Sequence, residues 1–356
     1  MKNRKWIVVA MAAVLMAGTI LSGCNSKKAE NSEPETASVI ETSEEVSEVV
    51  SEVPEEVYPD PTEPVAEFGG DPEKVVLFEE YAYYEADRFF IYFSEGCKVP
   101  DSTIDNLSRV MSDIEELFGL SYDTGREMDE DNWREFYYEG AFEYVNPTNQ
   151  KPNILILPNP GDDTVEWAYQ NCVMLYDTSL DPHGETYDTT YHELTHLLFA
   201  KQCGSLGQVI DEGAASYAQY ELSKKDNYPA WSTIMFLEYG YYHSTYDDSA
   251  IYADPEAEFI ASTVASRDSL QRHYQYGIRF VTFLMKEYGP DIMVKICENA
   301  NANTLKNDNE QTYLLVDIIK KSSSDTVFTE FAEWLPQGWQ DFGKEYTEYM
   351  RQFGLQ

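Results

Sequence analysis

The sequence predicts an α+β protein, in which a mixed β-sheet with helices comes first and a mainly helical C-terminal lobe follows. Two observations carry this prediction. Short runs rich in β-branched and aromatic residues occur in the first half of the chain, at residues 88–93, 153–157 and 172–176. From about residue 188 onward, the apolar residues recur almost exclusively at helical spacing.

Each early element follows from its own pattern. Residues 101–118 predict a helix that Asp101 or Ser102 can cap. Its apolar residues fall on one face: Ile104, Leu107, Val110, Met111 and Ile114. The run Asn153–Leu157 is typical of a buried strand. The run Cys172–Tyr176 predicts another strand, whose edge we expect to be able to pair with an extended peptide.

The first 24 residues predict an export signal. Lys2, Arg4 and Lys5 form a positive start, and the stretch Trp6–Leu21 is apolar almost throughout. This stretch is shorter than the roughly 20 residues that a spanning helix needs, so it is typical of a signal peptide. The residues ending at Cys24 resemble a bacterial lipobox, which implies a diacylglycerol anchor on that thiol. We therefore expect an exported protein, lipid-anchored on the outer face of the bacterial cytoplasmic membrane; an ordinary signal peptide or an uncleaved anchor is the alternative.

An acidic spacer follows the signal. Residues 25–70 hold 13 acidic and 2 basic side chains, and Ser, Glu, Val and Pro dominate their composition. Such a segment buries too little apolar surface to offset its ordering entropy, so we predict a disordered linker. Residues 71–356 then form one globular domain, with lobes expected at about 71–202 and 203–356.

Charge and cysteine content exclude several classes of function. The chain carries 64 acidic and 25 basic residues, a formal net charge of −39, and this excess argues against a nucleic-acid partner. Four cysteines remain beyond Cys24, and none belongs to a CxxC pair that would indicate a thiolate metal site. We expect these four to be small buried residues rather than halves of disulfide bridges: Cys97, Cys172, Cys203 and Cys297.

One motif carries chemistry. His192, Glu193 and His196 form an HExxH pattern within a helical run. Residues four apart on a helix lie on one face, one turn apart, so both imidazoles can coordinate a single Zn²⁺ ion at about 2 Å. Glu193 lies about 100° round the helix from His192, where it can reach a zinc-activated water without becoming a ligand. The alternative is a core helix with two hydrogen-bonded histidines.

A catalytic zinc site needs a third protein ligand and an open fourth position. Gly204 and Gly207 break the helix, and the next helix carries the pattern E-G-x-A-x-Y, which begins at Glu212. HExxH followed by this pattern resembles the gluzincin zinc peptidases, the superfamily of thermolysin and the zinc aminopeptidases. The resemblance implies a zincin-like fold and makes Glu212 the third zinc ligand.

Neighbours of Glu212 receive supporting roles. Gly213 and Ala214 suit a close approach of two helices at the metal. Asp211 is the alternative ligand, although capping or support of the ligands is the role we expect for it. Glu212 itself could instead be an acid that favours the positive end of a helix dipole.

A later Tyr-x-x-Gly segment completes the resemblance. Aminopeptidases of this superfamily place a tyrosine in such a segment, at the head of a helix, to stabilise the oxyanion of the reaction. Here the segment runs from Tyr274 to Gly277, so the resemblance places Tyr274 in that role. Tyr276 and His273 are the alternatives.

One departure from the superfamily bears on specificity. Its aminopeptidases recognise the substrate N-terminus with a G-x-M-E-N strand before HExxH. The nearest similarity here is the segment Gly140–Tyr144, which begins 52 residues before His192 and ends in Tyr where Asn belongs. We interpret it as coincidence, which favours an endopeptidase.

The sequence therefore predicts a cell-surface zinc metallopeptidase that hydrolyses peptide bonds. His192, His196 and Glu212 would bind Zn²⁺, with Glu193 as the general base. The expected partners are a peptide or protein substrate, and the membrane through the lipid anchor only. The alternative is a non-catalytic surface binding or adhesion lipoprotein that retains the zincin fold.

Overall fold

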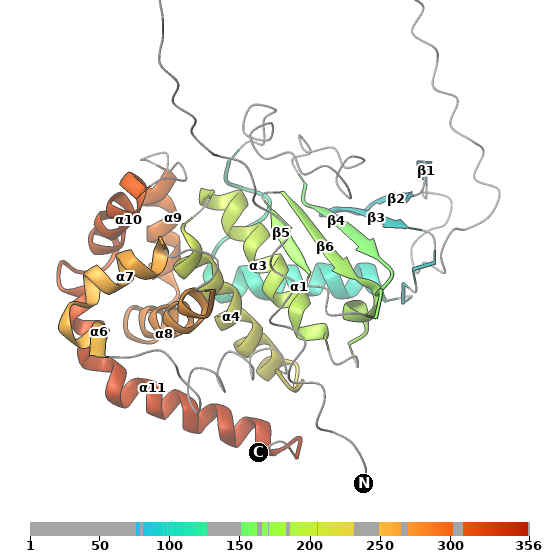
Figure 1. Ribbon diagram of the computed structural model, residues 1–356. Helices are drawn as coiled ribbons and strands as arrows, with labels where there is room; N and C mark the ends of the chain where they lie inside the picture. Colours follow the sequence, from blue (N-terminus) through green and yellow to red (C-terminus); the bar gives the residue numbers. More distant parts are fainter. Residues whose placement is uncertain are drawn as a thin grey trace, which may run out of the picture.

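The computed structural model describes the part of the chain that carries the HExxH motif and most of the predicted elements (Figure 1). The described residues are 76–78, 81–94, 96, 97, 99, 100, 102–126, 151–161, 166–169, 171–182, 186–204, 206–230, 249–264, 270–301 and 309–354. The signal peptide, Cys24 and the linker 25–70 lie outside them and stay predictions, as does the division into two lobes. No helix among the described residues is both long enough and apolar enough to span a bilayer.

Within the described residues, six strands form one mixed sheet in the order β1-β2-β3-β4-β6-β5. Strands β3, β4 and β6 are parallel, and the remaining pairs are antiparallel. The strands are β1 (Val76–Phe78), β2 (Tyr81–Glu85), β3 (Phe90–Ser94), β4 (Asn153–Leu157), β5 (Trp167–Tyr169) and β6 (Cys172–Tyr176). The strands predicted at 153–157 and 172–176 are thereby confirmed.

The two faces of the sheet follow the alternation of side chains along each strand. Ile91, Ile154 and Val173 lie in register on adjacent parallel strands and belong to the main apolar core. Leu155 and Met174 point to the opposite face and belong to a smaller apolar cluster. Both faces of these strands are therefore buried, as is typical of parallel strands.

The position of β6 corrects one prediction. We expected the edge of Cys172–Tyr176 to be free for an extended peptide, but β6 pairs with β4 on one side and β5 on the other. β5 is the outer strand of the described sheet at this end. Its three residues pack beside the helix that carries the HExxH motif.

The helices are α1 (Thr103–Phe118), the 3₁₀ turn η3 (Asp177–Leu180), α3 (Tyr187–Cys203), α4 (Gln208–Lys225), α6 (Ser249–Ala253), α7 (Pro255–Thr263), α8 (Leu270–Tyr288), α9 (Asp291–Asn301), α10 (Asn309–Ser322) and α11 (Val327–Arg351). The predicted helix ending at Phe118 is confirmed as α1. Ser102 occupies its N-cap position, but the Ser102 side chain makes no capping hydrogen bond. The mixed sheet followed by helices confirms the α+β class.

Helix α3 occupies the middle of the molecule. It contacts α1, β5 and β6 on the side of the sheet, and α4 and α9 on the side of the C-terminal helices (Figure 1). Most of its residues are buried on every side, polar ones included. A polar side chain in such a helix needs a partner, and the partners of its histidines come from α4.

Candidate metal centre

The two histidines of the motif face the same way from α3. His192 and His196 are one helical turn apart, and their ring centroids are 4.8 Å from each other. His192 is buried and His196 is partly exposed, so the pair faces solvent mainly through His196. The spacing that predicted a shared metal therefore places both rings side by side in the structure.

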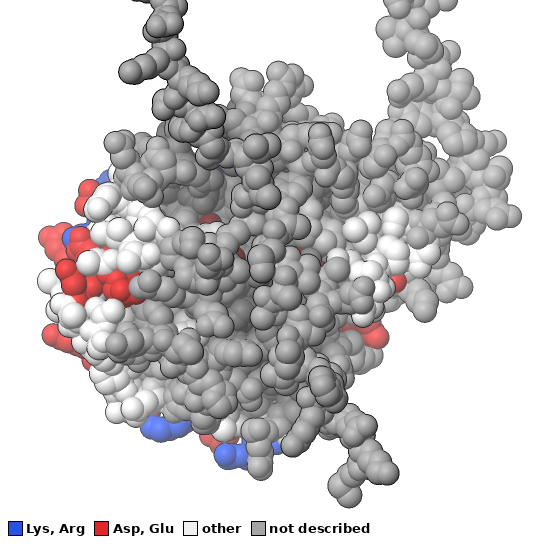
Figure 2. Space-filling view, in the orientation of Figure 1, with Lys and Arg blue, Asp and Glu red and all other residues white. Residues whose placement is uncertain are grey.

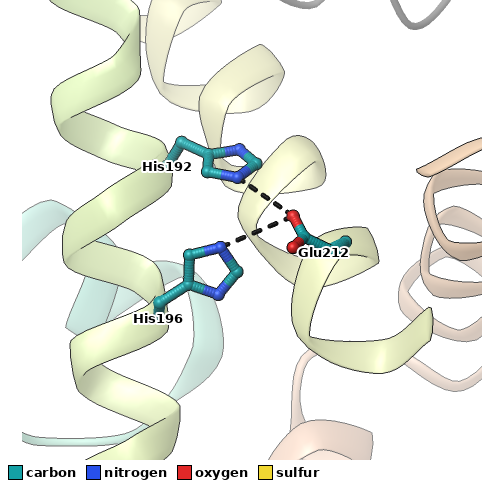
Figure 3. A group of neighbouring side chains, drawn as sticks. All are labelled: His192, His196 and Glu212. Carbon is teal, nitrogen blue, oxygen red and sulfur yellow. Dashed lines mark hydrogen bonds and ion pairs between the residues drawn. The ribbon is translucent and has the colours of Figure 1, made fainter. Parts of the chain in front are cut away.

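Glu212 reaches these rings from α4. Gly204 ends α3 and Gly207 precedes α4, both with positive φ, so the chain turns back and α4 runs alongside α3. The Glu212 Oε2 atom lies 3.2 Å from Nε2 of His192 and 3.6 Å from Nε2 of His196 (Figure 3). The carboxylate thus points between the two imidazoles.

These three side chains fit a zinc ion. Their potential ligand atoms all lie within 4.8 Å of one another. Two ligands that are each about 2 Å from a tetrahedral ion lie about 3.3 Å apart, and the distances of 3.2 and 3.6 Å match this separation. Two imidazoles and one carboxylate are also a donor set that zinc hydrolases use, with a fourth position left for water or substrate.

Glu212 and His196 each shift the pKa of the other. Burial alone would raise the pKa of Glu212, but the imidazoles of His196 and His192 outweigh it and hold this pKa well below its usual range. Burial alone would lower the pKa of His196, but the Glu212 carboxylate outweighs it and raises this pKa to about 9. At neutral pH a divalent cation would therefore displace a proton from His196 when it binds.

Gln219 supports the first histidine, although no sequence motif predicted this role. Its Oε1 atom lies 3.3 Å from Nδ1 of His192, and its side chain is only 1% exposed. A hydrogen on Nδ1 that donates to this oxygen leaves the lone pair on Nε2, the atom that faces Glu212. Gln219 follows Glu212 by seven residues, or nearly two full turns, and this spacing was the available signal.

Glu193 lies in the same buried region and is 7% exposed. Burial raises the pKa of its carboxyl, the charges of His192 and His196 oppose the rise, and Glu212 adds to it. A carboxylate that is costly to keep ionised is a better proton acceptor than an exposed one. Its surroundings therefore suit the general-base role that the motif predicted.

A second buried carboxylate, Glu166, lies near Glu193 and had no motif to indicate it. The Tyr176 N–H donates to Glu166 Oε1 at 2.7 Å, and the Thr189 hydroxyl donates to Oε2. Burial raises the pKa of Glu166 to about 7, with the negative charge of Glu193 adding to the rise. Thr189 precedes Glu193 by one turn of α3, so Glu166 lies along the same face of that helix.

Tyr274 reaches the centre from α8. Its ring centroid is 6.2 Å from that of His192, and its hydroxyl hydrogen-bonds Glu212. Burial, and then the negative charges of Glu212 and Glu193, raise the pKa of Tyr274 well above its usual range. The phenol is therefore protonated at neutral pH and able to donate a hydrogen bond.

A contact between glycines brings α8 this close. A Cβ atom added to Gly213 would lie 2.4 Å from the carbonyl oxygen of Gly277, and one added to Gly277 would lie 2.4 Å from that of Val209. The backbones of α4 and α8 therefore touch beside Glu212. Tyr274 precedes Gly277 by almost one turn of α8, so this crossing brings the Tyr274 ring beside His192 and Glu212. The close approach of two helices that the sequence predicted at Gly213 is therefore present.

Tyr276 and His273 were the alternatives for the oxyanion role, and Asp211 was the alternative third ligand. The Tyr276 hydroxyl donates to the Pro255 carbonyl at 3.0 Å, and its ring packs among phenylalanines of the core. His273 is completely buried in α8. Asp211 accepts a hydrogen bond from the Leu206 N–H at 3.3 Å and so supports the turn into α4. The segment Gly140–Tyr144 lies outside the described residues.

Comparisons with known proteins give distant similarities only. No protein-family model matches the chain, and no curated protein matches it. Among solved structures, it is similar to an M1 zinc metallopeptidase from Deinococcus radiodurans, with 14% identity, a TM-score of 0.38, and coverage of 69% of this chain and 47% of that one. It is also similar to a mutant M1 zinc metallopeptidase from the same organism, bound to a Tyr-Ser-Ala substrate. Here the identity is 13% and the TM-score 0.37, with coverage of 73% of this chain and 50% of that one.

A two-domain mutant M1 zinc metallopeptidase with bound L-tryptophan is similar at 12% identity and a TM-score of 0.38, over 73% of this chain and 50% of that one. This chain thus spans about half the length of the enzymes that it matches. A likeness of this size does not assign the chain to a family.

Proposed function

We propose that the protein is a zinc-dependent peptidase that hydrolyses peptide bonds, and that it acts at the outer face of the cytoplasmic membrane. The observation that carries this proposal is the convergence of His192, His196 and Glu212 beside the buried Glu193 (Figure 3). The residue types, their distances and their burial all suit a hydrolytic zinc site.

Each side chain has a defined task in this proposal. His192, His196 and Glu212 would hold the zinc ion, which when bound lowers the pKa of water and polarises a carbonyl group. Glu193 accepts the proton of the attacking water and passes it to the leaving amine. Tyr274 donates a hydrogen bond from its hydroxyl group to the oxyanion that develops on the substrate. Such a hydrogen bond is worth roughly 3 kcal/mol in a dry site.

The position of β5 supports a mode of substrate binding. β5 is the outer strand of the described sheet beside α3, and Glu166 immediately precedes it. An extended peptide that added to this edge would run alongside the helix that carries the motif. We propose this edge in place of the one that we first expected on β6, because a peptide added to it could be an internal segment of a chain, as an endopeptidase requires.

The acidic surface bears on the choice of substrate. The globular region, residues 71–356, carries a net charge of −31, and Figure 2 shows acidic side chains gathered over the region of α7. Such a field attracts cationic peptides from a distance, and salt weakens the attraction.

The lipid anchor at Cys24 is a separate part of the proposal. Loss of palmitate labelling in Cys24→Ala would support the anchor, and retention of the label in that variant would contradict it.

The decisive experiment compares wild type with Glu193→Gln, using casein and a mixed peptide library. We expect hydrolysis to fall by about 10²- to 10⁴-fold in this variant, with one zinc ion still bound. Glu298→Gln serves as the control, because Glu298 is exposed on α9. Unchanged hydrolysis by zinc-loaded Glu193→Gln would contradict the mechanism. Zinc binding without chelator-sensitive cleavage would favour a non-catalytic surface lipoprotein.

A further inference from the structure

Two buried thiols meet where the metal-binding helix ends. Cys203 is the last residue of α3, and Cys297 lies in α9, 94 positions further along the chain. Their Sγ atoms are 2.9 Å apart, which is closer than two non-bonded sulfur atoms normally approach. The two side chains are 4% and 2% exposed, so they face each other inside the core.

Other contacts fix the two helices at this point. The Asn301 side-chain amide, at the end of α9, donates to the Gln202 carbonyl at the end of α3. The Gly204 N–H donates to the Ala200 carbonyl at 3.0 Å and ends α3 directly after Cys203. The sulfur atoms are therefore brought together by backbone that is held on both sides.

The other two described cysteines have different surroundings. The Cys97 thiol donates to the Ile156 carbonyl at 3.4 Å and lies 3.6 Å from the Ser94 hydroxyl. Cys172 lies in β6, where its thiol hydrogen-bonds Asn153. Both are buried like Cys203 and Cys297, so burial alone does not distinguish the pair; the facing sulfur atoms do.

We propose that Cys203 and Cys297 form a disulfide bond that cross-links α3 to α9. For these two residues the facing sulfur atoms replace the sequence-based expectation of unbridged cysteines. Formation of one S–S bond removes two protons and two electrons from the two thiols. A disulfide-bearing oxidant accepts them: its S–S bond breaks, and it is released as two thiols. An exported protein meets such oxidants, whereas a cytosolic one meets reductants.

The bond would form while the chain folds. Burial raises the pKa of Cys203 well above its usual range, and a protonated, enclosed thiol exchanges slowly. The loop closed by this bond would contain Glu212, Gln219 and Tyr274, which reach the centre from α4 and α8. The cross-link would therefore restrict the part of the unfolded chain that supplies these three residues, whether or not the centre hydrolyses peptides.

The test maps the bond in the full-length chain. Reduced, denatured protein is refolded with zinc in a mixture of oxidised and reduced glutathione, then denatured with iodoacetamide and no reductant. We expect Cys97 and Cys172 to be alkylated, and the peptides of Cys203 and Cys297 to appear as one linked species, two mass units lighter than the separate thiols. Alkylation of all four cysteines, or a different pairing, would overturn the proposal; the peptide of Cys24 is scored separately.

A second measurement separates the cross-link from loss of a buried thiol. The Tm of oxidised wild type should exceed that of Cys203→Ala/Cys297→Ala by roughly 10 °C, as expected for so long a loop. The matched control is Cys97→Ala, which removes one buried thiol and no bond. With a reductant present throughout thermal unfolding, the Tm of wild type should fall and that of the double variant should stay unchanged, because unfolding exposes the bond; equal effects on both would contradict the cross-link.

Discussion

At the scale of single residues, Gln219 provides a test of how the centre is held. Gln219→Leu removes the acceptor for His192 Nδ1 and leaves the ring free to turn, so zinc affinity should fall by about 10- to 100-fold. Gln219→Glu keeps an acceptor and should retain the affinity. Competition with a chromophoric chelator measures both, with Gln208→Leu at the exposed start of α4 as the control. Unchanged zinc affinity in folded Gln219→Leu would show that Gln219 does not orient His192 for metal binding.

Glu166 predicts a pH dependence of stability. Its pKa rises from 4.5 to about 7 on folding, so the folded protein holds the proton more tightly than the unfolded chain. This contribution is complete below pH 4.5 and is lost as the pH rises through about 7. Relative to Glu166→Gln, wild type should therefore lose up to about 3 kcal/mol of unfolding free energy over this range.

Urea denaturation at a series of pH values measures that difference, with Glu298→Gln as the control. Parallel stability profiles for wild type and Glu166→Gln would show that Glu166 titrates normally in the folded protein. Any effect of zinc binding that both proteins share cancels in the comparison.

The sequence predicted some site residues and missed others for a physical reason. His192 and His196 are neighbours because of helical geometry alone, so local spacing was enough to pair them. Glu212 needed a second motif, because the turn between α3 and α4 sets its position. Glu166 approaches from the strand region through tertiary packing, and no local pattern encodes that contact.

At the scale of elements, the crossing of α4 and α8 determines where Tyr274 lies. Replacing a helical glycine with alanine normally stabilises a helix by up to about 1 kcal/mol. Gly213→Ala should instead destabilise the protein by about 1–3 kcal/mol, because the added Cβ meets the Gly277 carbonyl. It should also reduce kcat by moving Tyr274 away from Glu212.

Thermal unfolding and peptide hydrolysis measure the two effects of Gly213→Ala. Ala214→Gly, at the next position of α4, changes helix propensity in the opposite sense without adding bulk. A stabilised Gly213→Ala protein with normal kcat would show that the close approach of α4 and α8 does not require a glycine at position 213.

The elements were predictable where the sequence pattern was strong. The helical spacing of apolar residues predicted α1, and continuous apolar runs predicted β4 and β6. The order of the strands in the sheet could not be predicted from local sequence patterns. β5 has only three residues, too few to show a recognisable strand pattern. The unbroken apolar run of β6 did hold a signal, because strands buried on both faces are usually interior ones.

At the scale of the whole molecule, the centre lies where the sheet region meets the C-terminal helices. α3 contacts the sheet on one side and α4 on the other, and α8 contacts α4 in turn (Figure 1). Residues from three helices therefore converge on one buried point, although Tyr274 is distant from the motif in sequence. A single zinc ion bound there would tie α3 to α4 and stabilise the folded state by mass action.

The most direct test of this account is the zinc affinity of Glu212→Ala, measured by competition with a chromophoric chelator. Wild type and Glu193→Gln should each bind one zinc ion with the same affinity, because Glu193 is not a ligand. Glu212→Ala, shown to be folded by circular dichroism, should lose the ion on dialysis. Retention of one zinc ion with wild-type affinity in that variant would contradict the proposed centre.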